Sequence, residues 1–143
     1  MKPFPLGLAI GTDICQISRV GRILAGPRRG RFLGRILTAG EREAAEARMR
    51  LRPGGTGCRE EASFVAGRFA AKEAVIKAFS SRAKLGWHDI EVERGGGGGE
   101  GTGPVGRVRR GECEGGEGED EEVLLSISHD GDYATAFCVA SIR

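Results

Sequence analysis

The chain has 143 residues and a mass of 15.2 kDa, which is enough for one domain with a core of its own. Its formal net charge of +2 combines a basic segment at 14–40, with six arginines and no acid, and an acidic segment at 111–122, with seven acids and no base. No apolar run approaches the length of a membrane span, which disfavours an integral membrane protein, and the four scattered cysteines lack the spacing of a zinc site.

The first predicted element is a short strand at 6–10, an apolar run that would place Asp13 at its end, facing a cleft. The strand begins so early that we expect no signal peptide or conventional transit peptide before it. Apolar residues at helical spacing then predict a helix over 17–24, with Arg19 and Arg22 on its outer side. A basic surface of this kind attracts an acidic partner, which could be nucleic acid, an anionic membrane or an acidic protein.

Two further helical segments follow a break at Gly26-Pro27. Apolar residues predict a short helical turn at 32–37. The sequence at 38–41 fits a capping box, which would start a mainly exposed helix that reaches about Arg50. Residues 52–58 contain three glycines and a proline and predict a loop.

The most informative element is a helix predicted over about 60–80, around the sequence SFVAGRFAAKEAVIKAF. Glu73 and Lys77 are four residues apart and share a face, while Arg68 and Lys72 line a neighbouring stripe. Most other positions are apolar or small, so we expect the helix to be largely buried and closely approached by another backbone. The spacing alone also fits an ordinary solvated Glu–Lys pair, which stabilises a helix by only about 0.3–0.5 kcal/mol.

The C-terminal part is predicted to consist of strands interrupted by low-complexity sequence. The predicted strands are 89–93, 105–108, 123–128 and 133–140, and a hairpin at 129–132 joins the last two. A glycine tract at 95–103 and the acidic tract at 111–122 form a Gly/Glu-rich insertion over about 95–122. With most helices before most strands, the sequence predicts a single α+β domain over 1–143.

Several polar residues could form a site. Asp13 and Glu73 come from separate elements and offer hard carboxylate oxygens, which together with water and substrate phosphates are the usual ligands of Mg²⁺. Donors to phosphate oxygens would be Lys72, Lys77, Arg68 and His129. Ser126 and Ser128 alternate onto one face of their strand, so both could point at one ligand. Each feature alone is weak, because Ser-x-Ser is often only a polar strand face and a histidine after a strand is more often a turn residue.

Three stretches together resemble the motifs of the 4′-phosphopantetheinyl transferases, specifically the short holo-acyl-carrier-protein synthase group. IGTDI at 10–14 is similar to that group's N-terminal Gly-x-Asp strand, GRFAAKEAVIKAF at 67–79 to its W/F-x-x-K-E-x-x-x-K helix, and SISHD at 126–130 to its Ser-x-Ser-His element. RILTAGE at 35–41 and DIEV at 89–92 match positions between these motifs. The resemblance covers all but the insertion, and it implies a short, single-domain α+β fold with helices packed on a small, mainly antiparallel sheet.

That family moves the phosphopantetheine arm of coenzyme A onto a serine of an apo acyl carrier protein and releases 3′,5′-ADP. The resemblance therefore implies an enzyme with coenzyme A as co-substrate and with Asp13, Glu73 and Lys77 as catalytic residues. Asp13 and Glu73 would hold Mg²⁺ on the coenzyme A pyrophosphate. The residues implied to bind coenzyme A are Lys72, Lys77, Arg68, Ser128 and His129. The identity of the general base stays open.

The resemblance also gives the basic segment a partner, because carrier proteins are acidic and dock on the first helix of this family. Arg19 lies at the matching position and Arg22 faces the same way, so both are predicted to bind an acidic acyl carrier protein rather than nucleic acid. Short members of the family are commonly homotrimers with active sites between subunits, and a homotrimer is therefore expected. The implied process is fatty acid biosynthesis.

The insertion departs from the family pattern, which usually has a compact Gly-Lys-Pro turn and strand at this point. Such low-complexity insertions suggest a eukaryotic relative, for example a fungal one. The predicted compartment is the mitochondrion if the protein is eukaryotic and the cytoplasm otherwise. A further hypothesis is that the acidic tract folds back on the arginines and competes with the carrier protein.

Two alternatives belong to other functional classes. A non-catalytic scaffold could bind coenzyme A or form trimers without turnover, although the signature carboxylates and lysines are all present. A small basic nucleic-acid-binding module would explain the arginines, but the aromatic residues that stacking platforms would require are few. It would also leave Asp13 and Glu73 unexplained.

Overall fold

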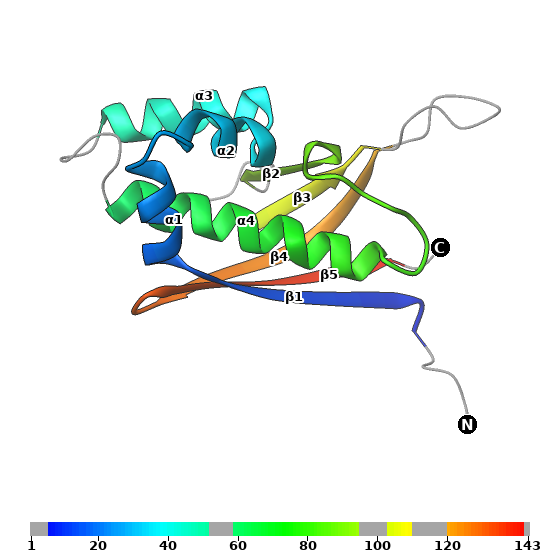
Figure 1. The fold of residues 1–143 in the computed structure, drawn as a ribbon. Coiled ribbons are helices and arrows are strands. Elements are labelled where there is room, and N and C mark those ends of the chain that lie inside the picture. Colours follow the sequence, from blue (N-terminus) through cyan, green and yellow to red (C-terminus); the bar gives the residue numbers. More distant parts are fainter. Residues whose placement is uncertain (1–5, 52–58, 95–102, 110–119, 142–143) are drawn as a thin grey trace.

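The computed structural model describes residues 6–51, 59–94, 103–109 and 120–141 (Figure 1). The elements in chain order are β1 (Leu8–Gln16), α1 (Ile17–Leu24), α2 (Arg29–Ile36), α3 (Ala39–Arg50), α4 (Arg59–Phe79), the 3₁₀ helix η1 (Trp87–Asp89), β2 (Ile90–Arg94), β3 (Pro104–Val108), β4 (Glu121–Asp130) and β5 (Tyr133–Ser141). The predicted α+β class is confirmed. The predicted loop at 52–58, almost all of the glycine tract and most of the acidic tract lie outside the described residues.

The five strands form one antiparallel sheet in the order β1-β5-β4-β3-β2. Helix α4 runs along one face of this sheet, and α1, α2 and α3 gather around its N-terminal half (Figure 1). Among the described residues, no helix combines the length and apolar character needed to cross a membrane.

Small residues allow α4 to pack directly against the sheet. The buried small residues of α4 are Ala62, Ala66, Gly67, Ala70, Ala71, Ala74 and Ala78. Gly11 of β1 lies so close to the helix that an added Cβ atom would be 1.9 Å from the backbone oxygen of Ala74. This confirms the predicted close approach of another backbone, and it explains why a glycine stands in the middle of a strand.

The first strand is longer than predicted. It continues to Gln16 instead of ending at residue 10, so Asp13 lies inside β1, opposite Ala136 of β5, and not at a strand end. The sequence suggested an early end because the apolar run stops at Ile10, just before Gly11. In the structure this glycine marks the crossing point with α4, and the strand runs through it.

The last hairpin is tighter than predicted. Strand β4 continues to Asp130, which leaves only Gly131 and Asp132 as the turn, and His129 lies in the strand opposite Ala134. Gly131 has a φ of +54°, in the left-handed region that favours glycine. The other end of β4 also extends further, because Glu121 of the predicted acidic tract is the first strand residue and pairs with Arg82.

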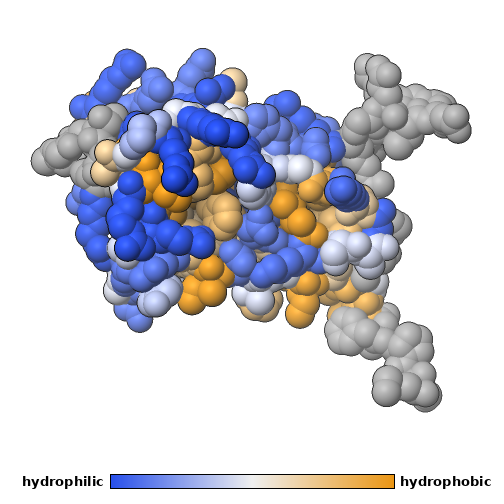
Figure 2. Space-filling model, viewed as in Figure 1, coloured by the Kyte–Doolittle hydropathy of each residue, from blue (hydrophilic) through white to orange (hydrophobic). Residues whose placement is uncertain are grey.

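Among the described residues, no helix covers the face of the sheet opposite α4 along β1, β5 and β4, and we call this face the open sheet face. The exposed apolar residues of this face are Leu8, Ile10, Ile14, Leu124, Tyr133 and Phe137. Their register places them on one side, because Ile10 pairs with Val139, which also pairs with Leu124. Figure 2 shows apolar side chains emerging along the lower edge of the molecule, where β1 runs in Figure 1.

Candidate active site

The centre of the candidate site is an ion pair between β1 and α4. Lys77 donates from Nζ to Asp13 Oδ1 at 2.7 Å and to the Thr12 backbone oxygen at 2.9 Å. The Asp13 side chain is 17% exposed and that of Lys77 is 52% exposed. The Lys77 ammonium group is therefore accessible to a ligand from solvent. The strand alternation places Asp13 on the same face as Gly11, where α4 crosses.

Glu73 lies one helical turn before Lys77, as the spacing predicted. Its Oε1 accepts a hydrogen bond from the indole Nε1 of Trp87 at 2.6 Å. Glu73 and Asp13 therefore belong to directly packed elements, and Asp13 contacts Lys77, which follows Glu73 by one helical turn. Within the described ranges, no group of three or more His, Cys, Asp or Glu side chains could hold a metal ion by itself.

Lys72 occupies a different environment from the one predicted. Its side chain is fully buried, and Nζ donates to the backbone oxygens of Ile36 at 2.8 Å and Trp87 at 3.0 Å and to Glu41 Oε2 at 2.5 Å. Burial lowers the pKa of Lys72, and the adjacent Glu41 carboxylate opposes that shift. The prediction that Lys72 binds coenzyme A is corrected, because all three donor contacts are directed into the protein.

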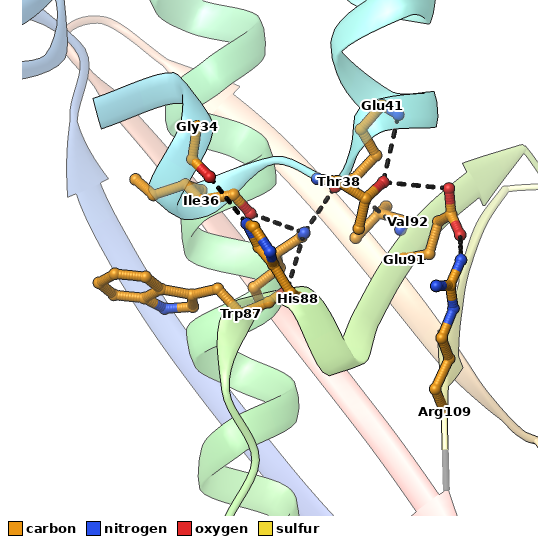
Figure 3. Close-up of polar contacts among 10 residues, drawn as sticks. Gly34, Ile36, Thr38, Glu41, Trp87, His88, Glu91, Val92 and Arg109 are labelled. Atoms are coloured by element: carbon orange, nitrogen blue, oxygen red, sulfur yellow. Dashed lines mark hydrogen bonds and ion pairs between the residues drawn. The ribbon is translucent and has the colours of Figure 1, made fainter. Parts of the chain in front are cut away.

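The buried partner of Lys72 is part of the predicted capping box. Thr38 Oγ1 accepts from the Glu41 backbone N–H, and Glu41 Oε2 accepts from the Thr38 backbone N–H, which confirms the box at the start of α3. Glu41 Oε1 also accepts from the Val92 backbone N–H of β2. Figure 3 shows these contacts continuing from Thr38 to Glu91 and on to Arg109.

Ser128 and His129 point to opposite faces of β4. His129 packs on Gly67 of α4, and its Nε2 lies 3.1 Å from the Ser63 backbone oxygen. Ser128 lies on the open sheet face opposite Thr135, and Ser126 lies on that face too, as predicted. Within one chain, therefore, the structure does not bring Ser128 and His129 together. The remaining predicted coenzyme A ligand, Arg68, lies half-buried with its guanidinium 4.6 Å from the centre of the Phe64 ring.

The predicted partner-binding residues lie on α1. Arg19 and Arg22 line an open hollow together with Ile23, Gly26, Pro27 and Arg28. The surface over the N-terminal helices is mainly hydrophilic in Figure 2.

The N-terminus of α1 is held by the turn between β4 and β5. Asp132 accepts from the Ser18 backbone N–H at 2.9 Å and from the Ser18 hydroxyl at 2.6 Å, and its backbone oxygen accepts from the Ile17 N–H. Asp132 thus provides the cap that Gln16, the preceding residue, does not supply. The hydrogen bond from the Ser18 hydroxyl lowers the pKa of the Asp132 carboxyl.

Comparison with known proteins now decides the family. The model of the 4′-phosphopantetheinyl transferase superfamily matches residues 9–138. The chain belongs to this superfamily. It is 38% identical over 130 residues to a holo-[acyl-carrier-protein] synthase of Myxococcus xanthus, with 91% of each chain covered. It is also 37% identical over 159 residues to the mitochondrial 4′-phosphopantetheinyl transferase B of Aspergillus fumigatus, with 97% of each covered.

The fold is also similar to that of a solved structure from the same family. The holo-(acyl-carrier-protein) synthase of Bacillus anthracis in complex with coenzyme A (3′,5′-ADP) matches with a TM-score of 0.64 and 30% identity, covering 94% of this chain and 96% of that one. The predicted family and fold are confirmed.

Sequence reasoning missed three residues near the motifs of this phosphopantetheinyl transferase. Trp87 contacts Glu73, Glu41 contacts Lys72, and Asp132 caps α1. The capping-box pattern did identify Glu41, but only as a local helix signal. Nothing in the local sequence pointed to the other two contacts, which join separate elements.

Proposed function

We propose that this protein transfers the 4′-phosphopantetheine arm of coenzyme A to a serine of an apo acyl carrier protein and releases 3′,5′-ADP, in a reaction that depends on Mg²⁺. The observation that carries the proposal is the contact between Asp13 and Lys77. It brings the Gly-x-Asp strand onto the helix that holds Glu73, in a chain that resembles holo-acyl-carrier-protein synthases along almost its whole length.

The donor set suits Mg²⁺. Asp13 and Glu73 supply two carboxylates from neighbouring elements, and Mg²⁺ usually binds one or two carboxylates while water and substrate phosphates complete its shell. We assign Asp13 and Glu73 as its protein ligands. When bound, the ion would neutralise negative charge on the pyrophosphate of coenzyme A.

Lys77 would act on the same phosphates. Its ammonium group is half-exposed and donates to two groups of β1, Asp13 Oδ1 and the Thr12 oxygen. During transfer the serine hydroxyl loses its proton to a general base and its oxygen forms a bond to the phosphorus that carries the pantetheine arm, while the bond from that phosphorus to the departing 3′,5′-ADP breaks. Such transfers rely mainly on positioning and on neutralisation of charge. Lys77 would supply positive charge to the leaving phosphate as it departs.

The carrier protein would dock on α1. Arg19 and Arg22 flank the hollow there, and Arg28 adds a third guanidinium. An acidic protein surface would bind by charge complementarity, which steers the encounter and weakens with salt. The proposed protein partner is therefore an acidic acyl carrier protein.

The open sheet face would be covered by other copies of this chain. Ile10 is 65% exposed, Ile14 is 63% and Leu124 is 63%, although each lies in a regular strand. A contiguous apolar face of this kind marks an association surface. Following the family pattern, we propose a homotrimer, in which the Ser128 side of β4 would face a neighbouring subunit. Light scattering of the purified protein tests this directly, and Phe137→Glu should yield monomers.

The biological setting follows the carrier protein. We propose a role in fatty acid biosynthesis, in the mitochondrion if the organism is eukaryotic and in the cytoplasm otherwise. Support comes from relatives named as bacterial synthases and from one named as a mitochondrial transferase. Fluorescence microscopy of the full-length chain with a C-terminal tag in its own organism tests the compartment.

The function is tested by the intact mass of an apo acyl carrier protein after incubation with this protein, coenzyme A and Mg²⁺. A mass gain of one phosphopantetheine group is expected, and a chelator or Glu73→Ala should abolish it. Binding of coenzyme A without any mass gain on several acidic carrier proteins would contradict the proposal and indicate a non-catalytic scaffold.

A further inference from the structure

Two consecutive residues of α4 form hydrogen bonds with Trp87, one with its backbone and the other with its indole ring. Lys72 Nζ donates to the Trp87 backbone oxygen at 3.0 Å, while the Trp87 indole Nε1 donates to Glu73 Oε1 at 2.6 Å. Lys72 and Glu73 are adjacent, but their side chains leave the helix in different directions. Lys72 is fully buried and Glu73 is partly exposed. Trp87 therefore joins a buried ion pair to a predicted metal ligand.

We infer that Trp87 is a positioning residue, which fixes the Glu73 carboxylate through its indole N–H and is itself fixed by the buried pair of Lys72 and Glu41. The inference rests on the proposed function, because it assigns to Trp87 an effect on the metal affinity of the site that Glu73 would form.

The buried pair gives a rigid support. Glu41 Oε2 accepts from Lys72 and from the Thr38 backbone N–H, and Glu41 Oε1 accepts from the Val92 backbone N–H. Lys72 has three acceptors in total, so the pair joins the start of α3, the end of α2, β2 and η1 to α4. Figure 3 shows Ile36, Thr38, Glu41 and Trp87 arranged around this point. A buried charge with all of its hydrogen bonds made has little freedom to move.

The indole ring is also held on its faces. The Phe69 ring centre lies 5.9 Å from that of Trp87, with the two rings inclined at 50°, and the Arg35 guanidinium carbon lies 5.0 Å from the Trp87 ring centre. Because an indole N–H can only donate, it favours a carboxylate acceptor, and a hydrogen bond to a charged acceptor is strong and directional. The Glu73 carboxylate is thereby held in one orientation before any ligand arrives.

Groups that hydrogen-bond to metal-ligating carboxylates typically alter metal affinity by about 10- to 100-fold when they are removed. The variant is Trp87→Phe, which keeps an aromatic ring beside Phe69 but removes the indole N–H donor together with part of the ring. We expect Trp87→Phe to weaken Mn²⁺ binding by about 10- to 100-fold, measured by electron paramagnetic resonance on the full-length protein with coenzyme A. The concentration of Mg²⁺ for half-maximal transfer should rise similarly, while the rate at saturating Mg²⁺ changes little.

A control variant separates positioning from general loosening of η1. His88 follows Trp87, and its Nε2 lies 2.8 Å from the Gly34 backbone oxygen of α2. His88→Ala should leave Mn²⁺ affinity unchanged. A second variant changes the buried pair that holds Trp87. Lys72→Met combined with Glu41→Gln removes both buried charges and should weaken Mn²⁺ binding. Adding Trp87→Phe to this double variant should cause no further loss of Mn²⁺ affinity.

Tryptophan fluorescence gives a readout without turnover, because Trp87 is the only tryptophan of the chain. Its emission should change when Mg²⁺ is added with coenzyme A, and Glu73→Gln should abolish the change. The inference is overturned if Trp87→Phe binds Mn²⁺ as tightly as the unmodified protein, or if it lowers only the saturated rate. Absence of Mn²⁺ binding by the unmodified protein would instead refute the metal site in the proposed function, and the inference with it.

Discussion

Gly11→Ala tests whether the close contact between β1 and α4 sets the active-site geometry. The added Cβ atom would lie 1.9 Å from the Ala74 backbone oxygen and 2.8 Å from the Ala78 backbone nitrogen. Both neighbours are backbone atoms, so no side-chain rotation can relieve the clash. Restoring an ordinary contact of roughly 3.4 Å to the Ala74 oxygen requires the strand and the helix to separate locally by about 1.5 Å.

The expected cost has two parts. Overpacking of a tightly packed core destabilises a protein by about 1–3 kcal/mol, which should lower the urea midpoint. Asp13 is two residues from Gly11 and contacts Lys77 at 2.7 Å, so a displacement of this size also breaks or lengthens that contact. A misplacement of about 1 Å at an active site can cost about 100-fold in rate.

The assay compares urea unfolding and the rate of transfer for Gly11→Ala and Gly30→Ala. Gly30 lies in α2, and a Cβ atom there would meet nothing within 4 Å, so Gly30→Ala should be neutral or slightly stabilising because alanine favours helix. Equal stability and equal rate for Gly11→Ala and the unmodified protein would refute the packing argument.

Three further predictions concern docking and stability. Asp132→Ala removes the cap of α1 and should raise the Michaelis constant for carrier protein but not for coenzyme A; equal effects on both would contradict a docking role. The double variant of Arg19→Glu and Arg22→Glu should lower kcat/KM for carrier protein most strongly at low salt, whereas Arg42→Glu on α3 should have little effect, and a loss independent of salt would oppose electrostatic docking. Burial raises the pKa of Cys138 to about 11 from 9.0, so the stability that the protonated thiol contributes is complete below pH 9 and is lost as pH rises toward 11, by about 3 kcal/mol. Thermal unfolding of Cys138→Ala should lack this alkaline decline, and parallel pH curves for both proteins would contradict it.

Local signals in the sequence predicted the helices well. The capping box of Thr38 and Glu41 placed the start of α3, and the apolar spacing after residue 17 placed α1. These patterns succeed because each depends on residues within one or two turns. The strands were located, but β1 and β4 extend further than predicted, since strand length is set by partners elsewhere in the sheet.

The candidate site was predicted only in part, because several of its contacts join distant segments. Asp13 and Lys77 meet as the motifs implied, although they are 64 residues apart. Lys72 was misassigned because its acceptor, Glu41, is 31 residues away in the sequence. The pattern of the helix alone could not show that Lys72 pairs with a buried carboxylate instead of facing a ligand. Trp87 could not be assigned, since its role depends on where η1 packs against α4.

The measurement that tests the account most directly is the single-turnover rate of phosphopantetheine transfer for Asp13→Ala, Glu73→Ala and the double variant. If both carboxylates hold one Mg²⁺ ion, each single change should lower the rate by about 100-fold or more, and the double variant should be no slower than the slower single variant. Rate losses that multiply in the double variant, or a Glu73→Ala protein that transfers at the unmodified rate, would contradict a shared site.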